Sequence, residues 1–165
     1  MTTADEEFAA LYGARLRAVR RTAYLLCGDW RAAEDLAQTA FAKLYAAWPR
    51  LRDPRAADAY LRRIVARAHV DEARRPWHRR ELSSGDLPEP ASPTGDASED
   101  RVVVLAALAG VPPRQRACLV LRYYDDCSVT ETAAALGCSE GTVKSNTARG
   151  LDALRRLLPV GEETR

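Results

Sequence analysis

Apolar residues recur at helical spacing in three stretches of the first part of the chain. The stretch 5–28 carries the first stripe, and the stretch 30–48 carries a second stripe that runs from Ala33 to Trp48. A third begins at Asp53-Pro54, where a capping residue precedes a proline suited to the first helical position. No stretch alternates with period two over strand length. The pattern therefore predicts three helices and no sheet.

A second series of helical patterns occupies residues 98–158. Ser98 can cap a helix over 99–110, and Pro112-Pro113 opens another over 114–126. Ser128 and Glu131 form a capping box before a short helix, which ends where Gly137 permits a left-handed turn. Ser139 then caps a final helix. Two helices joined by a short glycine-containing turn are typical of a helix-turn-helix, whose second helix enters the major groove of DNA.

The final helix has a polar outer face. On a helical wheel, the outward positions are Gly141, Thr142, Lys144, Ser145, Ala148 and Arg149. The cations and hydroxyls of this set can bond to base edges or phosphate, and its small residues permit close approach to DNA. We therefore predict a DNA-reading surface; an ordinary exposed face of a helical hairpin is the alternative.

Charge divides the chain into three parts. Residues 1–76 hold 14 basic and 10 acidic residues, residues 77–100 hold 2 and 6, and residues 101–165 hold 9 and 7. The middle part is also rich in Pro, Ser and Gly, a composition that cannot bury a core. We expect an all-α protein of two small helical domains, residues 1–76 and 101–160, joined by a flexible acidic linker at 77–100.

The third predicted helix carries a basic polar face. Arg62, Arg63 and Arg67 lie on it, with Arg52 and Arg55 just ahead. Arginine presents a planar fork that suits phosphate and stacks on bases. This face predicts contact with nucleic acid, although a solvated surface is the alternative.

Other chemistry is not indicated. The four cysteines have no metal-binding spacing, which favours reduced thiols and no metal site. No run approaches the ~20 apolar residues that span a bilayer, and the acidic start MTTADEE is unlike a signal peptide. We find no nucleophile with a base, no carboxylate cluster and no phosphate-binding glycine loop. We therefore expect a cytoplasmic protein without membrane insertion, cofactor or enzymatic activity.

Three motifs resemble one protein family over nearly the whole chain. They are GDWRAAEDLAQTAFAKLYAAW, DAYLRRIVARAHVDEARR and VPPRQRACLVLRYYDDCSVTETAAALGCSEGTVKSNTARGLDALRRLL. In this order and spacing they resemble the extracytoplasmic function (group IV) RNA polymerase sigma factors of the sigma-70 family, and the Arg-rich, Lys-poor composition is similar to that of actinobacterial proteins. The resemblance implies an alternative sigma factor that binds core RNA polymerase and directs promoter-specific initiation, with no small-molecule substrate.

The resemblance also implies site residues. The first motif is similar to the segment that docks on the beta-prime clamp helices, here through Asp35, Leu36, Gln38, Thr39, Phe41 and Lys43. The stretch 51–67 is similar to the part that opens the minus-10 element and captures its non-template strand, here through Arg52, Arg55, Tyr60, Arg62, Arg63 and Arg67. The minus-35 readers are Thr142, Lys144, Ser145, Ala148 and Arg149, and the helices of 101–124 would bind the beta flap.

The chain departs from the family pattern at several of these positions. Many relatives have Trp at the position of Tyr60 and Asn at that of Arg67, and Asn146 and Ala148 also differ from common choices. The family further implies an anti-sigma protein as partner, and an acidic linker that either occupies an RNA path or is an inert tether. A stand-alone helix-turn-helix regulator remains one alternative, and a helical enzyme or protein-interaction module remains another.

Overall fold

The computed structural model of the chain describes residues 2–73 and 99–159, and these are helical with no strand. The first half contains α1 (Thr3–Cys27), α2 (Trp30–Ala47), the 3-10 turn η1 (Trp48–Arg50) and α3 (Pro54–Ala73). The second half contains α5 (Glu99–Ala109), α6 (Pro113–Leu119), the π-helical segment η2 (Val120–Tyr124), α7 (Val129–Leu136) and α8 (Glu140–Leu157). The predicted all-α fold is confirmed. Ser98 and the predicted linker, apart from Glu99 and Asp100, lie outside the described residues.

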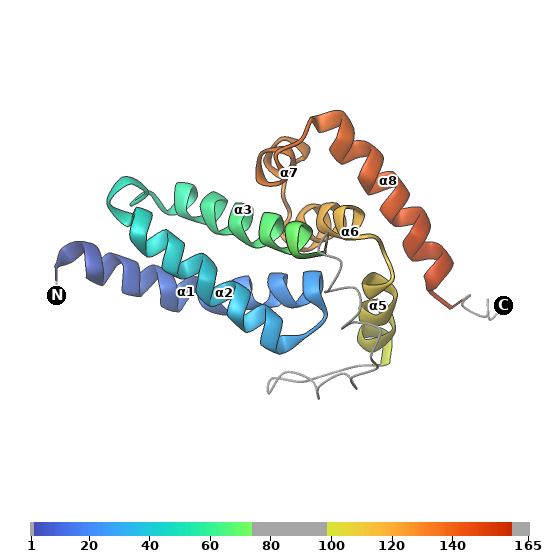
Figure 1. Cartoon of the computed structure of the whole chain (residues 1–165), viewed down its shortest axis with the longest axis horizontal. Helices are drawn as coiled ribbons and strands as arrows, with labels where there is room; N and C mark the ends of the chain where they lie inside the picture. Colours follow the sequence, from blue (N-terminus) through green and yellow to red (C-terminus); the bar gives the residue numbers. More distant parts are fainter. Residues whose placement is uncertain (1, 74–98, 160–165) are drawn as a thin grey trace.

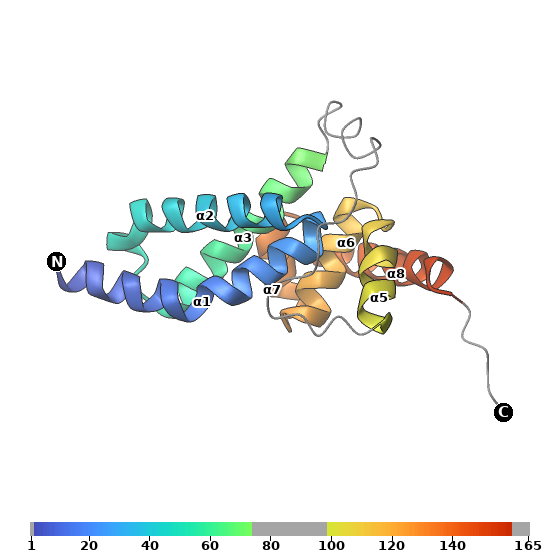
Figure 2. The same cartoon turned by 90° about the horizontal axis from the view of Figure 1, so that it is seen from below.

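The first half is a three-helix unit in which α1 and α2 lie side by side with α3 across them (Figures 1 and 2). Gly28 has a left-handed φ of 73° and ends α1, as its position in the sequence predicted. Asp29 then caps α2 by accepting a hydrogen bond from the Arg31 amide. Large fully buried side chains, including Leu26, Leu44 and Leu61, form the centre of this unit.

The second half contains the predicted helix-turn-helix. The side chain of Ser128 accepts from the Glu131 amide, and the Glu131 carboxylate accepts from the Ser128 amide, so the capping box is confirmed. Gly137 has φ 66° and ends α7, and Ser139 caps α8. The turn from Gly137 to Ser139 sets the angle at which α8 leaves α7.

One element of the second half differs from the expected regular helix. The helix that begins at Pro113 widens into η2, where the Asp125 amide donates to the Val120 carbonyl over 3.1 Å. The chain then turns at Asp126, whose φ of 53° is in the left-handed region that Asp tolerates. This turn brings Asp125 against the first half.

The two halves pack against each other, a contact that the sequence analysis did not predict. α3 lies against α7 and α6, and α1 against α5 and η2 (Figure 1). Ala66 of α3 is 0% exposed and packs with Leu121, Cys127 and Ala135 of the second half. α8 lies on the side of the second half away from α1 (Figures 1 and 2). No described helix is both long and apolar enough to cross a membrane.

Candidate nucleic-acid interface

The outward face of α8 carries the residues predicted to read double-stranded DNA. Lys144, Ser145, Ala148 and Arg149 are exposed, while Val143 before them and Gly150 after them are buried. Thr142 is half-buried, and its hydroxyl lies 2.9 Å from that of Ser139. The structure thus brings the five predicted residues to one end of one helix, and four of them are open to solvent.

Packing against α6 and α7 holds α8 in place. Val143 is fully buried in a cluster with Cys118 and Ala133, which ties α8 to α6 and α7. Gly150 lies so close to α6 that a Cβ atom there would stand 3.1 Å from Leu119. A rigid, closely packed support of this kind presents the outward side chains at a defined angle.

The residues predicted to contact a single strand do not form one open surface. Arg55 is exposed, and the guanidinium of the exposed Arg63 lies 5.2 Å from the ring centroid of Tyr60, a cation–π distance. Arg52 instead pairs with Glu7 of α1 at 2.7 Å. A nucleic acid backbone would have to displace that carboxylate.

Two further arginines of the same helix are directed at the second half. Arg67 donates from Nε to the Ala135 carbonyl over 3.0 Å and from Nη2 to the Ala134 carbonyl over 3.1 Å. Arg62, with a side chain 22% exposed, lies 3.6 Å from the Glu131 carboxylate. Sequence reasoning identified both arginines but not these partners, because the partners lie 67 or more positions away in the chain.

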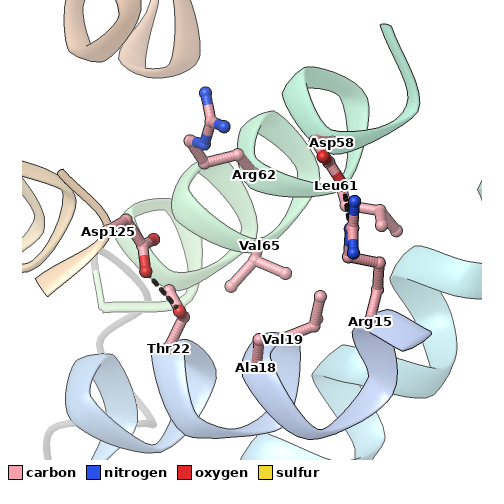
Figure 3. A pocket seen from close by; sticks show the side chains of 9 residues that line it. All are labelled: Arg15, Ala18, Val19, Thr22, Asp58, Leu61, Arg62, Val65 and Asp125. Carbon is pink, nitrogen blue, oxygen red and sulfur yellow. Dashed lines mark hydrogen bonds and ion pairs between the residues drawn. The ribbon is translucent and has the colours of Figure 1, made fainter. Parts of the chain in front are cut away.

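A cavity of about 180 Å³ lies where α1 and α3 meet the turn after η2 (Figure 3). Thr22 donates a hydrogen bond to Asp125 across it over 2.9 Å, and Arg15 pairs with Asp58 at 2.8 Å. Burial raises the pKa of Asp125 above its ordinary value, and the Thr22 hydrogen bond and the nearby positive charge of Arg62 oppose the shift. The cavity therefore lies where the two halves meet and partly buries the Asp125 carboxyl group.

The face of α2 predicted to bind a protein partner is mostly open. Asp35, Gln38, Thr39 and Lys43 are exposed, and Leu36 is half-buried. Phe41 is only 2% exposed, and its ring packs edge-on against that of Tyr12. Phe41 thus supports this face from beneath and does not present a contact surface in this conformation.

Burial makes three of the four cysteines unreactive. All four are free thiols, and burial raises the pKa of Cys27 to about 12 and those of Cys118 and Cys127 to about 11. These three thiols are protonated near neutral pH and are poor nucleophiles.

Comparison with known proteins finds similarity along almost the whole chain. Residues 11–79 match the model described as Sigma-70 region 2, and residues 101–154 match that of Sigma-70, region 4. The RNA polymerase sigma-E factor of Streptomyces coelicolor is 40% identical over 92% of this chain and 86% of its own length. The ECF RNA polymerase sigma factor SigL of Mycobacterium tuberculosis is 32% identical over 90% of this chain and 87% of its own length.

A solved structure resembles both halves together. The sigma factor RpoE of Bartonella quintana, solved in complex with the anti-sigma factor NepR, fits with a TM-score of 0.75 and 26% identity. The fit covers 94% of this chain and 99% of that one. A fit of that extent includes residues of both helical halves.

Proposed function

Because this chain belongs to the sigma-70 family of RNA polymerase sigma factors, in the extracytoplasmic function group, we propose that its two helical halves divide promoter recognition between them. The chain is an alternative sigma factor, which binds core RNA polymerase and directs promoter-specific transcription initiation. What we propose is which residues perform each part of that work. We also propose that the protein acts in the cytoplasm and has no enzymatic activity of its own.

The second half reads the minus-35 element in double-stranded form through α8. The observation that carries this proposal is the exposed set Lys144, Ser145, Ala148 and Arg149 on the second helix of a helix-turn-helix. Lys144 and Arg149 can donate to guanine O6 and N7 or to phosphate, and Ser145 can bond either base or backbone. Ala148 leaves room for α8 to approach the base edges, and Thr142 positions the first turn.

The helices within 101–124 would bind the beta flap.

The first half opens the minus-10 element and holds its non-template strand. Strand capture requires cations for the phosphates and a surface on which an unstacked base can rest. The exposed Arg55 and Arg63 and the half-buried ring of Tyr60 supply a set of this kind on α3. Arg52, Arg62 and Arg67 would join them once their present partners are displaced.

The exposed face of α2 binds the beta-prime clamp helices. Asp35, Gln38, Thr39 and Lys43 would make the polar contacts, with Leu36 at the apolar edge and Phe41 as support beneath. We further propose an anti-sigma protein as a partner. Its support is that a sigma factor solved with NepR superposes on both halves of this chain.

Reconstitution with purified core RNA polymerase tests the proposal. We expect promoter-specific transcripts only when both this protein and core enzyme are present. Arg149→Ala should cost about 1–3 kcal/mol at one or two base pairs of the minus-35 element, the range of one good base contact. Arg155→Ala is the matched control, because Arg155 lies on the last turn of the same helix and is exposed. Equal transcription by wild type and Arg149→Ala on every promoter would remove α8 from the reading role.

A further inference from the structure

We propose that Glu140, the first residue of α8, reads a cytosine in the major groove, and that Thr130 of α7 positions its carboxylate for that contact. Glu140 is not one of the residues predicted from the sequence to read the minus-35 element. Because Glu140 can read a base only if α8 enters the groove, the inference rests on the proposed function. It adds an acidic reader to a surface otherwise made of cations, a hydroxyl and small residues.

The carboxylate of Glu140 is exposed and yet held in place. Glu140 begins α8 at the edge of the molecule, beside α7 (Figure 1). The hydroxyl of Thr130, the second residue of α7, donates a hydrogen bond to one of its carboxylate oxygens over 2.5 Å. This bond joins the two helices of the helix-turn-helix. Since each carboxylate oxygen can accept more than one hydrogen bond, the restrained group keeps acceptor sites for a base.

Lys144 lies one helical turn beyond Glu140, on the same side of α8. A glutamate and a lysine at this spacing have Cβ atoms about 6 Å apart and can pair with each other. In the described part of the chain neither forms an ion pair, and Glu140 bonds to Thr130 instead. The helix therefore presents an acceptor beside a cation. A C·G base pair offers the matching pattern, the N4 donor of cytosine beside the O6 and N7 acceptors of guanine.

The first turn of α8 leaves space for DNA next to this carboxylate. Gly141 follows Glu140, and glycine weakens a helix. A Cβ atom at Gly141 would stand 3.9 Å from the Ser139 hydroxyl oxygen, an ordinary van der Waals distance, so packing within the protein does not require glycine here. A carboxylate this close to DNA is repelled by phosphate and gains only from a base that donates. Cytosine N4 is the donor that glutamate accepts from in the major groove.

Transcription from a randomised template pool tests the reading role. Full-length protein and purified core RNA polymerase are given templates with random minus-35 and minus-10 windows, each identified by a transcribed barcode. We expect the wild type to prefer cytosine, on one strand at one minus-35 position, by at least about fivefold over the other bases. Glu140→Gln should move this preference to adenine, because a glutamine amide bonds to adenine N6 and N7. Glu140→Ala should abolish it.

Variants of Thr130 test the positioning role separately. Thr130→Val removes the hydroxyl and should reduce the cytosine preference severalfold, whereas Thr130→Ser retains a hydroxyl and should keep it. Thr130 and Glu140 are both exposed, so these changes leave the core intact. Asp152→Asn is the matched control, because it removes a negative charge from an exposed position of α8 beyond the reading half. Its base preferences should equal those of the wild type.

Identical base preferences in wild type and Glu140→Ala at every minus-35 position would overturn the inference. A Glu140→Gln protein that transcribes all templates less, with no change in preference, would do the same, since it would show a role in charge or helix stability alone. An unchanged cytosine preference in Thr130→Val would remove Thr130 from its positioning role.

Arg149→Ala in the same pool separates this inference from the proposed function. If Arg149→Ala changes the minus-35 preferences and Glu140→Ala does not, α8 reads the element without Glu140, and only the inference fails. If the wild type gives no core-dependent transcripts, the proposed function fails and the inference fails with it.

Discussion

Replacement of Gly150 by alanine should destabilise the protein, although the same change elsewhere should stabilise it. Alanine in a helix interior is favoured over glycine by about 1 kcal/mol. At Gly150 the new Cβ would stand 3.1 Å from both Cγ and Cδ1 of Leu119 and 3.2 Å from the backbone oxygen of Gln115. Because a backbone oxygen cannot move without displacing α6, we assign an overpacking cost of about 2 kcal/mol. The expected net loss is about 1 kcal/mol.

Gly13→Ala is the matched comparison. Gly13 lies inside α1, and a Cβ atom there would meet nothing within 4 Å. It should therefore gain the full propensity term of about 1 kcal/mol. Thermal unfolding followed by far-ultraviolet circular dichroism measures both changes, each worth about 2–4 °C for a chain of this size. If Gly150→Ala raised the melting temperature as much as Gly13→Ala does, the close approach of α8 to α6 would be refuted.

Three further outcomes are expected. Ser128→Ala should cost about 1 kcal/mol of unfolding free energy in urea titrations through loss of the capping box, and Ser128→Thr should retain most of it. Asp125→Asn should raise the free energy of unfolding near pH 7, because burial raises the pKa of Asp125 and the stability of its protonated form is lost as pH rises through that pKa. In urea titrations the difference between variant and wild type should therefore shrink as the pH falls. Asp35→Lys should weaken binding to immobilised core polymerase at least severalfold, and the equally exposed Asp71→Lys should not; equal affinities would remove α2 from that contact.

Local sequence signals predicted the helices and their ends well. Gly28, Gly137 and the Ser128–Glu131 pair act on neighbours within four residues, so their effect can be read from the sequence without knowing the fold. The outward face of α8 was also predictable, because burial on a helix follows a fixed period. The π-helical widening of η2 has no such local signature and was missed.

The contact between the halves could not be predicted from periodicity. Ala66 falls outside the apolar stripe of its own helix, and its partners lie more than fifty residues away. The sequence around Arg67 is equally compatible with binding to phosphate and with binding to a helix end, because both offer oxygen acceptors to a guanidinium. Phe41 was placed on a binding surface because its motif belongs there, and only the packing against Tyr12 shows it to be buried.

Reciprocal bonding at Arg67 and Arg116 has a consequence for protein engineering. A hybrid chain could be made by joining the first half of one such protein to the second half of another. Here each half supplies an arginine that bonds to carbonyls at the end of a helix in the other half. A hybrid keeps these bonds only when it has an arginine at the position of Arg67 and of Arg116, and a glycine at that of Gly137. A mismatched hybrid would keep the helices of both halves and yet lose hydrogen bonds that join them.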